Sequence, residues 1–273
     1  MVHFASSSLF FHEYPLPEVF DYMEEAGLDA MEFWVETPSF WLAGRPEDDL
    51  ARCIAAHPGI GTINVHAPVL DLNPLSINPR VAAASVQYAV EAVGMAERIG
   101  AGVITLHPGR RTAKRVPGGP EFRRLSRYLG TLREASRGKR VRLALENMEK
   151  KVNFLLCSPE EMRELLDREP WLRFTLDVSH AMGTSIAEVN RYIDLCFDRL
   201  ANVHMSRASD GTMHLPIAGS DEMAGILHTL RDYGYEGTIT LEIEDRNFPQ
   251  ELSSEEKILL LSGEVAFLRK YLE

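Results

Sequence analysis

The sequence of 273 residues is poor in cysteine, has no long apolar run and carries no excess of positive charge. Its three cysteines, Cys53, Cys157 and Cys196, are widely spaced and odd in number, which argues against a disulfide framework and a thiolate metal cluster. They are instead typical of buried thiols in a reducing compartment. No window approaches the run of about 18 apolar residues that a membrane span needs. The first residues, MVHFASSSLFFHEY, also lack the basic segment and long apolar stretch of a signal peptide. We therefore expect a soluble, cytoplasmic protein.

Positive charge is outnumbered, and the formal net charge is −11. A surface of this sign should repel nucleic acid and anionic membranes, so a membrane partner is not expected and nucleic acid is disfavoured. Composition is otherwise that of an ordinary globular protein, with 45% hydrophobic and 25% charged residues. Oligomeric state does not follow from these numbers.

Short apolar runs alternate with longer amphipathic stretches along the whole chain. The runs predict eight strands, at residues 2–5, 30–33, 61–65, 103–106, 141–145, 174–176, 200–203 and 238–241. The stretches between and after them predict helices at residues 16–26, 48–56, 79–99, 122–136, from 159 onward, 186–195, 222–233 and 255–272. Ser158, Pro159 and Glu161 form an N-cap, a first-turn proline and a capping-box glutamate for the helix that starts at 159.

Eight strand–helix alternations predict a parallel sheet with right-handed crossovers. At this length the closed (β/α)8 TIM barrel is the natural solution, since about 250 residues is typical of that fold. An open, doubly wound sheet is the alternative, but no G-x-G-x-x-G follows the first strand. No repeat or linker divides the chain, so we expect residues 1–273 to form one domain.

Six consecutive predicted strands finish in a residue that can bind a divalent metal. In a barrel of this kind, the carboxyl ends of the strands converge on one face. A single residue of this type at a strand end is more often structural, but clustered carboxylates without a counter-charge would repel each other. A cation is the simplest compensation. The six residues are His66, His107, Glu146, Asp177, His204 and Glu242, and His180 and His214 lie in the loops nearby.

The ordered motifs NVHAP, TLHPG, ALENM, TLDVSH, NVHMS, HLPIAGSD and TLEIE resemble those of the xylose-isomerase-like barrel superfamily. This superfamily includes sugar and sugar-phosphate isomerases and epimerases, related lyases, and abasic-site nucleases of the endonuclease IV type (AP endonuclease family 2). The resemblance covers nearly the whole chain, and its motifs are more specific for the superfamily than for one reaction.

The resemblance implies a central metal with four ligands, Glu146, Asp177, His204 and Glu242. It also implies a second metal, bridged by Glu146 and held by His66 and His107, as in the nuclease branch. The third metal of that branch would use His180, His214 and an aspartate two residues before His214. The residue at that position is Thr212, and the nearby Asp210 is the alternative ligand. His180 and His214 are therefore left to a third ion or to the substrate. The cofactor is therefore one to three divalent ions per chain. Manganese, magnesium or cobalt suits the carboxylates, and zinc suits the histidine-rich flank.

Two mechanisms fit this arrangement. In the first, the metal polarises a carbonyl of a small sugar, sugar phosphate or related hydroxy-ketone. The resemblance implies that Glu146 and Glu242 then act as the catalytic pair, removing and returning a proton next to that carbonyl. In the second, a metal-bound hydroxide attacks the phosphodiester at an abasic DNA site. We favour the first, because Thr212 and the net charge of −11 count against the second. A barrel that only binds a ligand is a third alternative.

Two loops offer substrate contacts. Arg110 and Arg111 begin a basic segment after the fourth strand, and they can clamp a substrate phosphate or simply face water. The aromatic segment 33–41 places Trp34 where it can wall a sugar pocket, although most of its aromatic residues should pack in the core. Glu32 points to the opposite side of its strand from Phe33, toward the barrel mouth, and the sequence supplies no partner for it.

Overall fold

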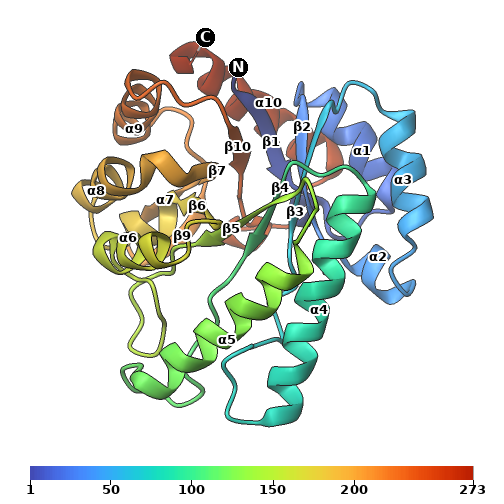
Figure 1. Ribbon diagram of the computed structural model, residues 1–273. Helices are drawn as coiled ribbons and strands as arrows, with labels where there is room; N and C mark the ends of the chain where they lie inside the picture. Colours follow the sequence, from blue (N-terminus) through green and yellow to red (C-terminus); the bar gives the residue numbers. More distant parts are fainter. Residues whose placement is uncertain (273) are drawn as a thin grey trace.

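The computed structural model describes residues 1–272 and has a closed barrel of eight parallel strands at its centre (Figure 1). The strands follow each other around the barrel in chain order, and β1 closes it by pairing with both β2 and β10. The predicted (β/α)8 TIM barrel is therefore confirmed. The eight strands are β1 His3–Ser7, β2 Ala30–Trp34, β3 Thr62–His66, β4 Val103–Leu106, β5 Arg142–Glu146, β6 Arg173–Asp177, β7 Leu200–Met205 and β10 Thr238–Leu241.

Helices surround the barrel, and α4 and α5 are the two that extend furthest below it in Figure 1. Three short 3-10 helices and a two-stranded hairpin complete the structure. The helices are α1 Leu16–Glu25, α2 Pro38–Leu42, α3 Glu47–Ala56, α4 Pro79–Arg98, α5 Gly119–Ala135, α6 Pro159–Arg168, α7 Val178–Met182, α8 Ile186–Cys196, α9 Asp221–Asp232 and α10 Ser254–Leu272. The 3-10 helices are η1 Ser8–Phe11, η2 Phe197–Arg199 and η3 Asp245–Asn247, and the hairpin pairs β8 Arg207–Ser209 with β9 Thr212–Leu215.

Local sequence signals set several helix starts. Asn78 and Ser158 accept hydrogen bonds from Arg80 N and Glu161 N, which caps α4 and α6 as expected from these residue types. The Glu161 side chain reaches the backbone N–H of Cys157 rather than that of Ser158. The predicted N-cap of α6 is therefore correct, but its capping box is displaced by one residue.

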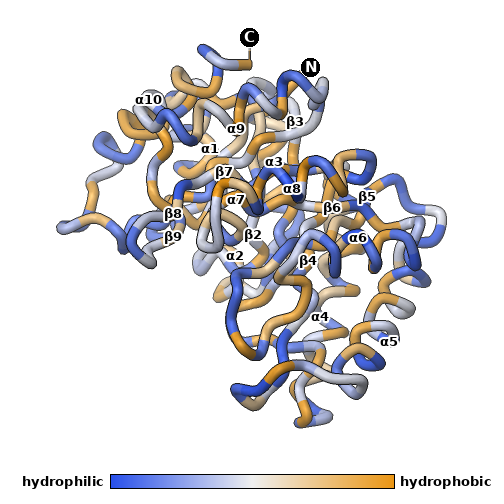
Figure 2. The backbone as a smooth tube through the Cα atoms, turned by 90° about the vertical axis from the view of Figure 1, so that its left-hand side faces the viewer, coloured by the Kyte–Doolittle hydropathy of each residue, from blue (hydrophilic) through white to orange (hydrophobic). Residues whose placement is uncertain are grey.

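Most of the apolar core lies between the strands and the helices. Outward-facing residues such as Leu145, Leu176 and Val203 are fully buried against the helix layer. Figure 2 shows hydrophobic and hydrophilic segments alternating along the helices, as expected for helices with one face on a core. No helix within residues 1–272 is both long and apolar enough to cross a bilayer.

The interior of the barrel is mainly polar near its carboxyl end. A small separate apolar cluster of Val103, Ala144 and Ala201 occupies part of the interior. Because side chains alternate along a strand, each ligand-type residue at a strand end has a second inward residue two positions earlier. Several of these are polar and fully buried, among them Thr105, Thr175, Asn202 and Thr240. The end of the barrel is thus built from polar layers and not from the branched apolar side chains usual in this fold.

Candidate metal centre

Four side chains from neighbouring strands meet at the carboxyl end of the barrel. Glu146 and Asp177 end β5 and β6, His204 lies near the end of β7, and Glu242 directly follows β10. One oxygen or nitrogen atom of each lies within 4.8 Å of those of the others. Asp177 and His204 are fully buried, and Glu146 is 1% exposed. The fold thus brings together the four residues that the family resemblance implied as ligands of one metal, here called the central group.

The donor atoms of the central group fit a divalent cation. Asp177 Oδ2, His204 Nδ1 and Glu242 Oε2 are buried and make no hydrogen bond within residues 1–272. The Nδ1 atom of His204 lies 2.9 Å from Glu242 Oε2 and 4.0 Å from Asp177 Oδ2. Ligand atoms around one ion, each about 2.0–2.2 Å from it, lie roughly 3 to 4 Å apart. His204 Nδ1 and Glu242 Oε2 are thus an ion pair without the directed geometry of a hydrogen bond, and Asp177 Oδ2 has no hydrogen bond. Because buried polar atoms without hydrogen bonds are costly, a cation shared by all three would satisfy them.

The other oxygen of Asp177 fixes the direction of the carboxylate. Oδ1 accepts hydrogen bonds from the Ser179 hydroxyl at 3.0 Å and from the backbone N–H of His180 at 2.6 Å. The Asn147 side chain joins the ends of β5 and β6 by bonding both Asp177 N and Asp177 O, at 2.8 and 2.9 Å. Asp177 therefore also caps the short helix α7, while its Oδ2 atom is left for the central group.

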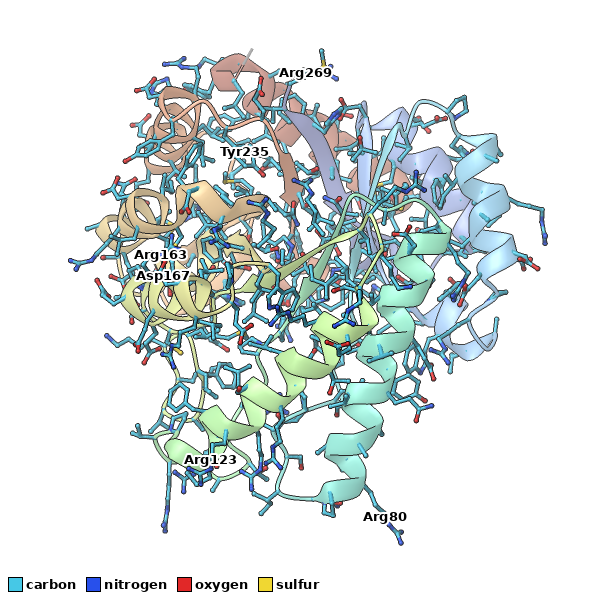
Figure 3. All side chains as sticks on the ribbon, in the orientation of Figure 1. Arg80, Arg123, Arg163, Asp167, Tyr235 and Arg269 are labelled. Carbon is cyan, nitrogen blue, oxygen red and sulfur yellow. The ribbon has the colours of Figure 1, made fainter. Side chains whose placement is uncertain are left out.

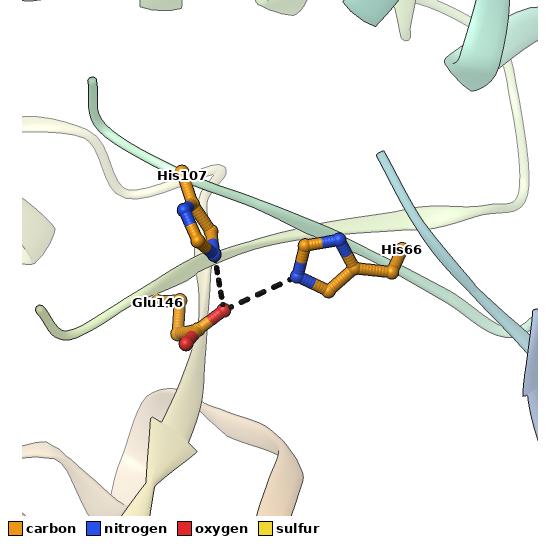
Figure 4. Close-up of side chains that lie close together, drawn as sticks. All are labelled: His66, His107 and Glu146. Atoms are coloured by element: carbon orange, nitrogen blue, oxygen red, sulfur yellow. Dashed lines mark hydrogen bonds and ion pairs between the residues drawn. The ribbon is translucent and has the colours of Figure 1, made fainter. Parts of the chain in front are cut away.

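A second group shares Glu146 with the first. The Oε2 atom of Glu146 lies 3.0 Å from His107 Nε2 and 3.4 Å from His66 Nε2, and Figure 4 shows both imidazoles directed at this oxygen. The Nδ1 atom of His66 lies 2.8 Å from the carbonyl oxygen of Ala67, an arrangement that keeps the proton on Nδ1 and leaves Nε2 free to bind a metal. The fold thus brings together His66, His107 and Glu146, the three residues that the resemblance implied for a second ion.

The predicted sugar wall, Trp34, stacks on His66 with ring centroids 3.8 Å apart and an interplanar angle of 10°. It is only 7% exposed, so it supports the imidazole more than it lines an open pocket. Phe33 and Phe40 pack edge to face and are fully buried, as expected for most aromatics of this segment. Part of the segment is helical, since α2 begins at Pro38.

A third group consists of Asp177, His180 and His214. His214 comes from β9 of the hairpin and has a backbone φ of 58°, in the left-handed region that residues other than glycine adopt infrequently. Its imidazole lies 5.4 Å from that of His180, centroid to centroid. Thr212 is exposed, and exposed Asp210 accepts a hydrogen bond from its neighbour Ser209. The group thus has one carboxylate, and Asp210 does not replace the missing second one.

Electrostatics divide the ionisable groups of the site by their charge. Burial favours the neutral form of Glu146, but the charges of His107 and His204 hold its pKa well below the usual range. Glu242 is affected in the same direction, because His204 lowers its pKa despite burial. Burial would lower the pKa of His180, yet the charge of Asp177 raises it to about 10. The pKa of His107 is lowered, mainly by burial. Burial would also lower the pKa of His204, but the charges of Glu32 and Glu242 raise it well above its usual value. At neutral pH the site therefore combines the carboxylate anions of Glu146 and Glu242 with two cationic imidazoles, those of His180 and His204, and the neutral imidazole of His107.

The two arginines of the basic loop have different surroundings. Arg111 donates to the carbonyl of Val116 at 2.6 Å and lies 3.9 Å from Glu121, so its guanidinium is engaged within its own loop. Arg110 is exposed and lines a pocket that also contains His107. Of the two predicted phosphate contacts, Arg110 is therefore the better placed. Further along the chain, Arg123 lies at the outer end of α5, away from the barrel (Figure 3).

Two pockets are lined in part by histidines of the site. One is next to His107 and is lined by Arg110, Met148 and Phe154 among others. The other is next to His180, has an empty volume of about 590 Å³, and is lined by Lys150 and the tip of the hairpin.

One further group of metal-ligand residue types is already occupied by a side-chain cation. His12, Glu13 and Asp245 lie close together. The ammonium of fully buried Lys257 bonds Glu13 at 2.5 Å, Asp245 at 3.1 Å and the carbonyl of Phe10 at 2.7 Å. This group ties α10 to the loop after β1 and does not belong to the metal centre.

A family model described as xylose isomerase-like TIM barrel matches residues 20–270. The chain belongs to this family. Among related sequences, the uncharacterized protein MJ1188 of Methanocaldococcus jannaschii is 31% identical over 271 residues, covering 98% of both chains. A second uncharacterized protein of that organism, MJ1311, is 28% identical over 229 residues, covering 77% of this chain and 70% of its own.

Solved structures of sugar epimerases share the fold. An L-ribulose 3-epimerase has a TM-score of 0.79 at 20% identity, covering 100% of this chain and 95% of its own. A D-tagatose 3-epimerase-like protein has a TM-score of 0.76 at 22% identity, covering 99% and 100%. A 3-keto-D-glucoside 4-epimerase, YcjR, from E. coli has a TM-score of 0.78 at 14% identity, covering 99% and 100%. At these identities the likeness concerns the fold.

Sequence reasoning missed the partners of Glu32 and the hairpin that carries His214. Glu32 is fully buried and lies 2.8 Å from His204 Nε2, through its Oε1 atom. The period-two pattern of β2 was a usable signal for its inward direction. Nothing in the sequence showed that the partner would come from β7.

Proposed function

We propose that this protein is a divalent-metal-dependent epimerase or isomerase of a small sugar, sugar phosphate or related hydroxy-ketone. The observation that carries the proposal is the central group, in which three buried donor atoms lack hydrogen bonds and two carboxylates have lowered pKa values. The fold shared with the ribulose and tagatose 3-epimerase structures supports the same reaction class.

The metal would be held by Glu146, Asp177, His204 and Glu242. When bound, it would polarise a substrate carbonyl and so acidify the neighbouring C–H bond. Zinc, manganese, magnesium and cobalt all accept this mixture of carboxylate and imidazole donors.

Glu146 and Glu242 are the proposed base and acid. One carboxylate takes the proton from the carbon next to the carbonyl, and the bonding electrons move toward the carbonyl oxygen. The other carboxylate takes up a proton from solvent and transfers it to the opposite face of the planar carbon, which inverts the configuration of that carbon and leaves the carboxylate ionised again. The lowered pKa values of both groups support their readiness to act as bases at neutral pH.

The histidines beside the central group are proposed to orient the substrate. His180, with its raised pKa, is suited to donate a hydrogen bond to a substrate oxygen that gains negative charge. Arg110, at the pocket next to His107, is proposed to bind a phosphate or other anionic group at one end of the substrate.

Formation of an epimer tests the proposal. The Mn²⁺-loaded protein is incubated with a panel of ketopentoses, ketohexoses and their phosphates, and products are resolved by ¹³C NMR. We expect one sugar to be converted to its epimer or aldose isomer, and we expect Glu242→Gln to lose the activity. Glu264→Gln, which removes a buried carboxylate outside the three groups, is the matched control. The absence of product across the panel, with metal shown to be bound, would reject the proposal.

A metal-dependent phosphodiesterase acting at abasic DNA sites is the second candidate. The observation that favours it is the pair of additional groups, one with His66 and His107 and one with His180 and His214. Against it stand Thr212 and the net charge of −11. Clean incision of a duplex oligonucleotide that carries an abasic analogue would replace our first proposal.

A further inference from the structure

A layer of buried polar side chains lies directly beneath the central group, inside the barrel. Asn202 and Thr240 stand two residues before His204 and Glu242 on β7 and β10, and both are fully buried. The hydroxyl of Thr240 lies 3.2 Å from Asn202 Oδ1, within hydrogen-bond distance. These groups form a network that continues the site into the barrel.

Glu32 is the charged member of this layer. It comes from β2, which is separated from β7 by β1 and β10 in the order of strands around the barrel. Its Oε2 atom accepts a hydrogen bond from Asn202 Nδ2 at 2.6 Å and lies 3.3 Å from the hydroxyl of Thr240. Its Oε1 atom lies 2.8 Å from His204 Nε2. One carboxylate oxygen is therefore held by the network, while the other is directed at the imidazole.

The two ring nitrogens of His204 thus have different neighbours. Nε2 faces an acceptor that cannot donate when ionised, so Nε2 must carry the proton. Nδ1 faces the carboxylates of the central group and has no hydrogen bond within residues 1–272. A carboxylate behind a ligating histidine fixes its tautomer and ring orientation and increases its basicity as a ligand.

We propose that Glu32 is a positioning residue of the metal centre, which holds the proton of His204 on Nε2 and presents Nδ1 to the metal. This inference rests on the proposed metal centre. A purely structural role would not require a carboxylate oxygen reserved for the imidazole, because the network of Asn202 and Thr240 contacts the other oxygen.

Nitrogen-15 NMR of the wild-type protein tests the assignment directly. The protein is labelled at histidine nitrogens and loaded with Zn²⁺, which is diamagnetic, and His204 is assigned by comparison with His204→Gln. We expect Nδ1 to show the shift of a zinc-bound nitrogen and Nε2 to keep its proton. A spectrum in which Nε2 binds zinc or Nδ1 carries the proton would overturn the inference.

A variant pair separates positioning from structure. Zn²⁺ affinity is measured by competition with a chromogenic chelator for wild type, Glu32→Gln and the control Glu264→Gln. Glu264 is also a buried glutamate, but it accepts from the backbone N–H groups of Ile217 and Ala218 and contacts no histidine within the described chain. We expect Glu32→Gln to weaken zinc binding by about 10- to 100-fold and Glu264→Gln to leave it unchanged. Unchanged affinity in Glu32→Gln, or an equal loss in both variants, would overturn the inference.

The outcomes distinguish this inference from the proposed function. Zinc binding without epimer formation would reject the proposed reaction and leave the role of Glu32 intact. If Glu32→Gln does not fold, the wild-type spectrum decides. A wild-type protein that binds none of the four candidate ions would reject both the metal centre and the role of Glu32.

Discussion

Binding of a divalent ion to the central group should raise the thermal stability of the protein, and Asp177→Asn should remove that gain. The ion would engage three buried atoms that have no hydrogen bond in the described chain, on Asp177, His204 and Glu242. A ligand present at 100 times its dissociation constant stabilises the folded state by about 2.7 kcal/mol. For a chain of this size, that energy corresponds to a rise in Tm of roughly 5 to 10 °C.

The substitution is chosen to change one atom of the site. Asn at position 177 keeps an oxygen that can accept from Ser179 and from the N–H of His180, so the cap of α7 is retained. It loses the charge and the donor atom that face the ion. The charge of Asp177 also stabilises the cationic form of His180. The rise in Tm on metal binding is therefore measured for each variant against its own metal-free form.

Thermal unfolding followed by circular dichroism provides the assay. Metal-free wild type, Asp177→Asn and the surface control Asp198→Asn are each scanned with EDTA and with Mn²⁺, Mg²⁺, Co²⁺ and Zn²⁺ in turn. Asp198 is an exposed residue that pairs with Arg163 on the exterior, and it belongs to none of the three groups of the site. We expect the metal-dependent rise in Tm in wild type and in Asp198→Asn, and not in Asp177→Asn. A rise of the same size in Asp177→Asn, or no rise in wild type with any of the four candidate ions, would refute the reasoning.

Three further predictions concern the basic loop, the second group and a buried glutamate outside the site. Arg110→Ala should raise the KM for a phosphorylated substrate by about 10-fold or more in steady-state assays, because a charge-assisted hydrogen bond is lost. Arg111→Ala should leave that KM nearly unchanged, since its guanidinium binds within its own loop; equal effects would contradict the assignment. His66→Asn should lower the number of zinc ions bound per chain by one in elemental analysis if the second group is a metal site, and an unchanged number would exclude it. Burial raises the pKa of Glu264 in the folded protein, so its protonated form is favoured by folding. The stability gained from this protonation is present below the usual glutamate pKa and is lost as pH rises through the pKa of the folded state. In urea titrations, the unfolding free energy of wild type should therefore rise relative to that of Glu264→Gln as pH falls from about 7 to 5. A fall relative to the variant would contradict this sign.

The barrel itself could be predicted from the sequence because each strand is a short apolar run bounded by a helix. The runs at 103–106 and 238–241 match β4 and β10 at both ends. The strand ends were equally readable, since a His, Asp or Glu that closes an apolar run must lie at the carboxyl end of the barrel. The pattern of apolar and polar residues within each segment was sufficient to predict the strands and the residues at their ends.

Features that depend on contacts between distant segments could not be predicted. The short helix α7 forms because Asp177 caps it, and no apolar periodicity marks its five residues. The hairpin β8–β9 is a local pair of two short strands outside the barrel, and its turn at Asp210 and Gly211 was not recognised. The link from Glu32 to His204 spans 172 positions in the sequence, so only the closed barrel brings the two side chains together.

The central claim is proton transfer next to a carbonyl, and solvent exchange tests it most directly. The metal-loaded protein is incubated in ²H₂O with each ketose of the panel, and the recovered sugar is analysed by NMR and mass spectrometry. We predict one deuterium at the carbon that neighbours the carbonyl, dependent on the metal and lost in Glu242→Gln. Epimer formation without deuterium, or no deuterium in any sugar of the panel, would contradict the account.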